Sequence, residues 1–227
     1  RIALSHIAAN WFLQPAKQLR LIGITGTNGK TSTAYFTESI FKAAEIKTAL
    51  LGTIDYHFGK FILPAKTTTP DQIRLHNLFV RIADAKIKHV IMEASSQGMA
   101  QYRLSGLTFH VGAFTNLTQD HLDYHHSMEN YLESKLTLFQ QIDPESGCAI
   151  VNMDIPAANR VVKATNAPVI SYGVKSEADL MASDISSDLN GISFKAITPK
   201  GKVIIKLPML GDYNVYNALA SIGIGLH

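Results

Sequence analysis

Apolar and polar residues alternate along the chain in two rhythms, which predict strands and helices in turn. Short apolar runs bounded by glycine or polar residues are typical of buried strands, whereas apolar residues three and four positions apart predict helices. Strands are predicted for residues 19–25, 48–54, 89–94, 111–116, 148–152 and 168–172. Helices are predicted for residues 3–11, 30–44, 69–84 and 127–142, for a short segment after residue 152, and for a final segment that begins near residue 213.

The order of these segments predicts an α/β fold. Helices between successive strands favour a mostly parallel sheet with helices on both faces, and such sheets bind ligands at the carboxyl ends of their strands. Period-two alternation near residues 180–207 adds a small antiparallel strand region. Residues 56–63 predict a hairpin that turns at Gly59-Lys60. At Thr69-Pro70-Asp71 a helix is predicted to begin with a hydroxyl cap and a proline in its first position.

Composition excludes several classes of protein. The chain has 227 residues, of which 46% are hydrophobic and 17% charged, as expected for a globular protein with a large core. Its net charge of +3 comes from scattered residues, which argues against a nucleic-acid partner. No apolar run approaches the ~18 residues that cross a membrane. Cys148 is the only cysteine, so we expect no internal disulfide and a cytoplasmic location.

A glycine-containing loop follows the first predicted strand and leads into a helix. Its residues are Gly26, Thr27, Asn28, Gly29, Lys30, Thr31 and Ser32. Strand, loop, Gly-Lys-Thr and helix together indicate a P-loop, although Ile24 stands where the strict pattern has its first glycine. The two loop glycines let backbone N–H groups turn toward phosphate oxygens. Lys30 can then reach the β- and γ-phosphates, and the Thr31 hydroxyl can bind Mg²⁺.

Five segments together resemble the Mur ligase family and cover essentially the whole chain. They are residues 25–31, Thr-Gly-Thr-Asn-Gly-Lys-Thr; residues 67–71, Thr-Thr-Thr-Pro-Asp; residues 92–98, Met-Glu-Ala-Ser-Ser-Gln-Gly; residues 115–125, which include Asp-His-Leu-Asp-Tyr-His; and residues 210–214 with Asn217. The loop alone would not separate this family from folylpolyglutamate synthetases. The Thr-Thr-Pro-Asp and Asp-His-Leu-Asp-Tyr-His segments are similar to the MurE type, which adds the third residue to UDP-N-acetylmuramoyl-L-alanyl-D-glutamate in peptidoglycan synthesis.

This resemblance implies a domain organisation and a reaction. Residues 19–227 would be the central ATP-binding domain, and residues 1–18 the end of an N-terminal UDP-binding domain with its linker. The chain begins with Arg1 and ends in an apolar helix-like segment, so we expect a piece of a longer protein whose C-terminal domain is absent. We expect a monomer that binds nucleotide weakly and does not ligate by itself. In the whole enzyme, ATP would phosphorylate a substrate carboxylate, and an amine would displace phosphate from the acyl phosphate.

The resemblance also implies two magnesium sites. Glu93, at the end of a predicted strand, would share one Mg²⁺ with Thr31, although an acid at a strand end is more often simply exposed. His121 would bind the second ion. The segment that includes His125 is interpreted as a loop, with only a nearby role for that histidine.

Lys135 lies in the middle of an apolar stripe on its predicted helix. Burial lowers the pKa of an amine, and a neutral amine can react with CO₂ to form an anionic carbamate. Matching lysines of the family are carbamylated, so the resemblance implies a catalytic and metal-binding role. The alternative is a lysine that extends from the edge of the stripe to water.

The remaining site residues are also assigned by resemblance. Asn214 would contact the nucleotide near its base, unless it only caps a helix, a role that Asp212 could also fill. The amino acid that the enzyme adds, diaminopimelate or lysine, stays open. The residues expected to hold the UDP-muramoyl-dipeptide are Thr68, Thr69, Ser95, Gln101 and Arg103.

Three other functions compete with this prediction. Residues 94–98, Ala-Ser-Ser-Gln-Gly, resemble a nucleophile elbow with Ser96 as the nucleophile of a hydrolase, but the P-loop argues against that function. A regulatory module that binds nucleotide without catalysis is less favoured because Glu93, His121 and Lys135 are all present. A related ligase with a different acceptor is the third alternative.

Overall fold

The computed structural model describes residues 1–227, and one 11-stranded sheet runs through the molecule in the order β11-β10-β9-β8-β7-β6-β1-β5-β2-β3-β4. All neighbours from β2 to β9 in that order pair in parallel. The P-loop strand β1 lies in the middle, between β5 and β6. The strands are β1 Arg20–Thr25, β2 Thr48–Leu51, β3 Asp55–Phe58, β4 Phe61–Pro64, β5 His89–Glu93, β6 Val111–Phe114, β7 Cys148–Asn152, β8 Val169–Gly173, β9 Leu180–Asp188, β10 Gly191–Thr198 and β11 Gly201–Leu207.

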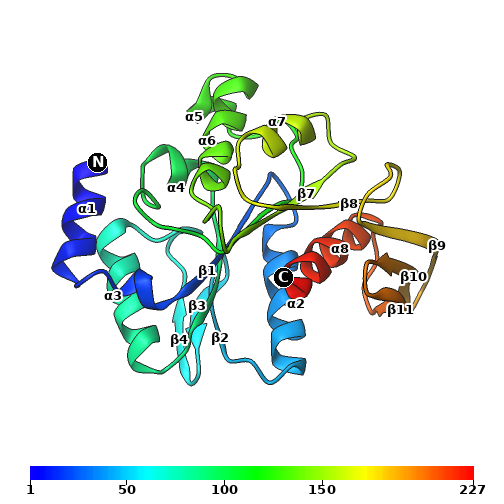
Figure 1. Ribbon diagram of the computed structural model, residues 1–227, viewed down its shortest axis with the longest axis horizontal. Helices are drawn as coiled ribbons and strands as arrows, with labels where there is room; N and C mark the ends of the chain where they lie inside the picture. The colour runs from blue at the N-terminus through cyan, green and yellow to red at the C-terminus, as the bar shows by residue number, and fades with distance from the viewer.

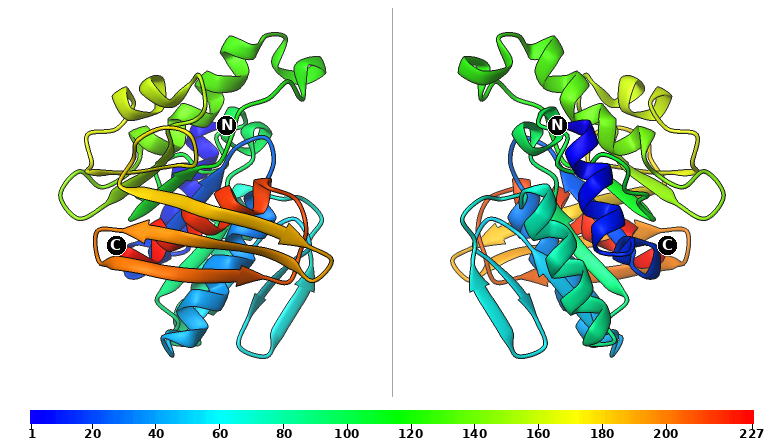
Figure 2. Two further views of the ribbon diagram at one scale, coloured as in Figure 1. Left: turned by 90° about the vertical axis from the view of Figure 1, so that its right-hand side faces the viewer. Right: turned by 90° about the vertical axis from the view of Figure 1, so that its left-hand side faces the viewer.

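Antiparallel strands close both edges of the sheet. At one edge β3 and β4 form the predicted hairpin, which turns at Gly59-Lys60. At the other edge β9 pairs in parallel with β8 and in antiparallel with β10, which pairs with β11. Figure 2 shows these last three strands as a twisted ribbon beside α8. The predicted mostly parallel sheet with an antiparallel region near residues 180–207 is therefore confirmed.

Helices cover both faces of the sheet, as predicted (Figure 1). Because side chains alternate along a strand, β1 contributes Leu21 to a core beneath α3, α6 and α7, and Ile22 and Ile24 to a second core beneath α2 and α8. The helices are α1 Ile2–Trp11, the 3₁₀ turn η1 Pro15–Gln18, α2 Lys30–Ala43, α3 Gln72–Asp84, α4 Ser96–Ala100, α5 Leu122–His125, α6 Met128–Gln140, α7 Ala158–Lys163 and α8 Tyr213–Leu226.

Two details of the predicted helices and loops are wrong. The N-cap of α3 is Asp71, whose carboxylate accepts the Arg74 N–H, so Pro70 lies before the helix rather than in its first position. The Thr69 hydroxyl instead donates to the Glu93 carbonyl at 2.8 Å and accepts the Ser95 N–H at 2.9 Å. The segment interpreted as a loop around His125 is the short helix α5. With four residues, α5 is too short to carry a periodic pattern.

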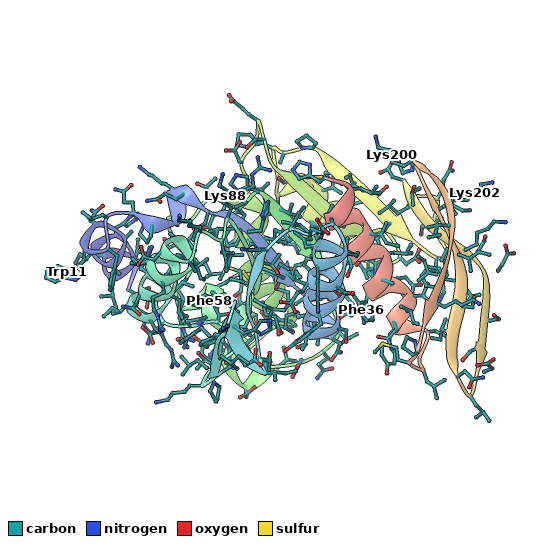
Figure 3. All side chains as sticks on the ribbon, turned by 90° about the horizontal axis from the view of Figure 1, so that it is seen from below. Trp11, Phe36, Phe58, Lys88, Lys200 and Lys202 are labelled. Carbon is teal, nitrogen blue, oxygen red and sulfur yellow. The ribbon has the colours of Figure 1, made fainter.

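The molecule is elongated along the sheet. Seen from below, Trp11 lies at one end, on α1, and Lys200 and Lys202 lie at the other, near the β10–β11 turn (Figure 3). No helix has the length and apolar character needed to span a bilayer.

Candidate functional site

Side chains that follow the end of β6 hold the P-loop in its conformation. The backbone of Gly26 has φ +143° and that of Gly29 has φ +84°, values that favour glycine. The Asn116 side chain accepts from Asn28 N–H at 2.9 Å and donates to Asn28 O at 3.0 Å, while Thr115 Oγ1 donates to the same carbonyl at 2.6 Å. No side chain caps the amino end of α2, so its first N–H groups remain available for an anion.

Two lysines converge on one carbonyl of this loop. Lys30 Nζ donates to Gly26 O at 2.9 Å and to Thr27 O at 2.7 Å, and Lys135 Nζ donates to Gly26 O at 2.9 Å. Burial lowers the pKa of both amines, and the charge of Lys30 lowers that of Lys135 further. Lys30 and the free N–H groups at the start of α2 make this part of the site attractive to an anion such as a phosphate.

The structure places Lys135 inside the protein, so the alternative of a lysine that reaches water from the stripe edge is wrong. Its side chain is 1% exposed, and Nζ lies 4.3 Å from the centre of the Tyr131 ring. The Tyr131 hydroxyl in turn donates to Thr27 Oγ1 at 3.1 Å. Burial holds the pKa of Lys135 well below its usual 10.5, which favours the neutral amine.

This burial predicts a pH dependence of stability. Between the lowered pKa of folded Lys135 and the unfolded value of about 10.4, the unfolded chain binds more protons, so the free energy of unfolding should rise with pH. Lys135→Met should lack this component, and its stability difference from the original chain should change steadily between neutral pH and about pH 10. Urea unfolding in CO₂-depleted buffer measures the effect. The exposed Lys202→Met is the control, and parallel curves for Lys135→Met and the original chain would contradict the prediction.

Glu93 ends β5 beside the start of α2 and is only 1% exposed. Thr31 Oγ1 lies 3.0 Å from each oxygen of its carboxylate. Thr53 supplies two more donors, its N–H to Oε1 at 2.8 Å and its hydroxyl to Oε2 at 2.9 Å. Sequence reasoning missed Thr53 because β2 was expected to continue to residue 54. The strand ends at Leu51, and a Cβ on Gly52 would lie 2.5 Å from Glu93 Oε1, so only glycine allows this close approach.

The Thr31 and Glu93 oxygens fit a magnesium site. Two ligands about 2.1 Å from an octahedral ion lie about 3 Å apart, which matches the spacing of these atoms. No group of three or more histidine, cysteine or acidic side chains is close enough to form a metal cage. The two oxygens of Thr31 and Glu93 suit Mg²⁺, which commonly uses one or two protein ligands together with phosphate oxygens and water.

A single cavity of about 510 Å³ brings most of the predicted site residues together. His121 lines this cavity in a left-handed conformation, with Nε2 3.6 Å from Asp120 Oδ2. The other predicted residues that line it are Thr27, Asn28, Gly29, Lys30, Thr31, Ser32, Thr68, Glu93, Ser95, Arg103 and Lys135.

Arg103 is positioned at this cavity by two predicted residues that do not themselves line it. Its guanidinium donates to the Gln101 side-chain oxygen at 2.7 and 3.1 Å and to Thr69 O at 2.6 Å. Thr69 is fully buried, and its hydroxyl pairs with Ser95 Oγ at 2.9 Å. Gln101 and Thr69 therefore hold the side chains that reach the cavity, and direct contact with a substrate stays a prediction for both.

Asn214 also lies outside the cavity, in the first turn of α8. Its side chain donates to Leu210 O at 2.8 Å and accepts from Asn217 at 3.1 Å. Asn217 lies against the P-loop, since a Cβ on Gly29 would come within 2.2 Å of its Oδ1. Asp212 is the N-cap residue of α8 but makes no side-chain cap hydrogen bond. A contact between Asn214 and the nucleotide base stays a prediction.

Ser96 and His125 form a pair that sequence reasoning did not find. Ser96 Oγ lies 3.0 Å from His125 Nε2, and both residues are buried. The second ring nitrogen faces Ser134 Oγ at 3.3 Å rather than a carboxylate, so the acidic member of a serine-hydrolase triad is missing.

Together, the sheet, the P-loop on its central strand and the carboxylate on the neighbouring strand define an α/β phosphate-binding protein of the P-loop class. Comparison with known proteins narrows this class. The sequence profile of the Mur ligase middle domain matches residues 24–225, and the chain belongs to that family.

Individual relatives are similar over nearly the whole chain. UDP-N-acetylmuramoyl-L-alanyl-D-glutamate–2,6-diaminopimelate ligase of Bacillus velezensis is 41% identical over 99% of the chain, and that of Geobacter sulfurreducens is 40% identical over 100%. A solved structure of a ligase with this name superposes with a TM-score of 0.89 at 26% identity, covering 99% of the chain and 47% of the solved one. The chain covers 47% and 45% of the two relatives, so it spans about half the length of the curated relatives it matches.

Proposed function

We propose that this chain is the ATP-binding core of a ligase that adds diaminopimelate to UDP-N-acetylmuramoyl-L-alanyl-D-glutamate. The observation that carries the proposal is the common cavity, in which the P-loop, the Thr31–Glu93 pair and Arg103 face one another. The names of the relatives support diaminopimelate as the added amino acid. Residues 1–18 as the end of an N-terminal domain, a monomeric state and a cytoplasmic location stay predictions.

On the nucleotide side, the P-loop N–H groups and Lys30 bind the β- and γ-phosphates of ATP. Lys30 exchanges its bonds to the loop carbonyls for phosphate oxygens, which neutralises charge as the γ-phosphoryl group moves. Thr31 and Glu93 would hold Mg²⁺, with His121 as the candidate ligand of a second ion. Bound metal would offset negative charge on the phosphates and on the attacking carboxylate.

On the acceptor side, Arg103, Thr68 and Ser95 bind and orient the dipeptide substrate. Its free carboxylate attacks the γ-phosphorus of ATP, and ADP leaves. The resulting acyl phosphate then reacts with the amine of the incoming amino acid, which forms the amide and releases phosphate. Lys135, modified by CO₂, would carry a negative charge in place of its amine and orient metal or phosphate from the wall of the cavity.

Precursor-dependent release of ADP tests this function. The full-length protein that carries this chain should release ADP when UDP-N-acetylmuramoyl-L-alanyl-D-glutamate and diaminopimelate are both supplied with MgATP, and mass spectrometry should detect the tripeptide. A regulatory module would bind ATP without precursor-dependent turnover. A related ligase would turn over only with a different precursor or amino acid, and either result would refute the proposal.

A further inference from the structure

The proposed ligation requires a group that accepts a proton, and none has yet been assigned. When an amine attacks an acyl phosphate, its nitrogen gains a bond and must lose a proton for the amide to form. One hydroxyl of the cavity wall, that of Ser96, is hydrogen-bonded to a buried histidine, His125. Ser96 is the first residue of α4 and lines the cavity, and His125 lies behind it, 4% exposed, at the end of α5.

The hydrogen bonds around His125 define which of its nitrogens carries the proton. The Ser134 hydroxyl donates to Asn130 O at 2.8 Å, so at His125 Nδ1, 3.3 Å away, it can only accept. Nδ1 therefore carries the hydrogen, and Nε2 is free to accept from the Ser96 hydroxyl at 3.0 Å. The Asn130 side chain also donates to His125 O at 3.0 Å, which fixes the residue from its backbone side.

A histidine whose Nε2 accepts a hydrogen bond from a hydroxyl of the cavity wall has the geometry that a general base requires.

We propose that Ser96 and His125 form a proton relay for the amide-forming step, an inference that rests on the proposed function. The amine nitrogen bonds to the carbonyl carbon of the acyl phosphate, and the bond from that carbon to the phosphate oxygen breaks. The nitrogen gives its excess proton to Ser96 Oγ while the Ser96 proton moves to His125 Nε2. His125 then returns the proton to water as phosphate leaves. Ser96 contacts the substrate, and His125 is a positioning and proton-accepting residue that acts through it.

Two partial reactions of the full-length enzyme separate this relay from a structural role. ATP labelled with ¹⁸O at the β–γ bridge exchanges its label when the acyl phosphate forms reversibly without amino acid, a step that needs no amine base. Ser96→Ala and His125→Gln should keep this exchange within about threefold of the original enzyme, while kcat for amide formation falls about 100-fold. The KM for diaminopimelate should change little.

Hydroxylamine provides a second readout, because it is a much weaker base than an amino acid and loses its proton more easily. Both variants should still convert the acyl phosphate to a hydroxamate at a rate near that of the original enzyme. Ser96→Thr, which keeps a hydroxyl, should restore part of the amide formation. His126→Asn is the matched control, because His126 is the exposed neighbour with no side-chain hydrogen bond, and it should leave both reactions unchanged.

Three results would overturn the relay. Variants that lose isotope exchange and amide formation equally would show that the pair only supports the fold or the first step. Variants with normal amide formation would show that another group takes the proton. Absence of exchange in the original enzyme would instead refute the proposed function itself, and the relay would fall with it.

Discussion

Lys30→Met should weaken MgATP binding roughly 10- to 100-fold, since a hydrogen bond to a charged group contributes about 1.5–3 kcal/mol. Lys30 is the P-loop cation, and its Nζ already lies within 2.9 Å of two loop carbonyls, where a triphosphate would also be bound. Methionine keeps most of the length and apolar volume of the side chain, so the loss should reflect the missing charge. Isothermal titration of the chain with MgATP measures the change.

Lys42→Met is the control for this substitution. Lys42 lies in the last turn of the same helix, is exposed and makes no side-chain hydrogen bond. It should leave the affinity within about twofold, because exposed charges distant from a site are largely screened by salt. Equal affinities of Lys30→Met and the original chain would contradict the assignment of Gly26–Thr31 as the phosphate loop.

Gly26→Ala should destabilise the protein by about 2–5 kcal/mol, the sum of backbone strain and overpacking. The backbone at Gly26 has φ +143°, and an added Cβ would lie 1.9 Å from Thr115 Oγ1 and 3.0 Å from Asn116 N. Thr115 cannot move without losing its bond to Asn28 O. Urea unfolding measures the effect, and binding of MgATP should fall in parallel because the loop shifts.

Gly59→Ala is the matched control, because it separates the strain of a left-handed backbone from the steric overlap of an added Cβ. Gly59 also has a positive φ, +56°, but an added Cβ would meet nothing within 4 Å. This variant should cost only about 1–2 kcal/mol, the penalty of a left-handed alanine. If Gly26→Ala cost no more than Gly59→Ala, the tight contact between the P-loop and the end of β6 would be contradicted.

The fold was largely predictable because it depends on patterns within short segments. β7 was predicted with both bounds correct, since all five of its residues are buried and the first four form one apolar run. The hairpin was predicted from its Gly59-Lys60 turn. β2 was predicted too long, because its apolar run continues to Ile54, whereas Gly52 and Thr53 leave the strand to meet Glu93. The short helices α4 and α5 contain too few residues for a periodic signal.

The site was predictable only where a motif names its residues. Lys135 could also be predicted by physical reasoning, because a lysine in an apolar stripe must either be buried or extend to water. In the structure it is buried. The roles of Thr53 and of the Ser96–His125 pair could not be predicted from the sequence. Their contacts join residues 40 and 29 positions apart, through loops and short helices without a pattern of their own. Only the folded sheet brings such side chains to one edge.

The carbonyl of Gly26 has a consequence for the rate at which the P-loop can bind a nucleotide. Because Lys30 and Lys135 both donate to this oxygen, the P-loop is held in a defined shape by two amines that line the cavity. When a nucleotide binds, Lys30 exchanges its loop carbonyls for phosphate oxygens, and the loop does not have to fold first. The loop therefore loses little backbone entropy when a nucleotide binds. We expect the association rate to be limited by diffusional encounter and not by loop rearrangement.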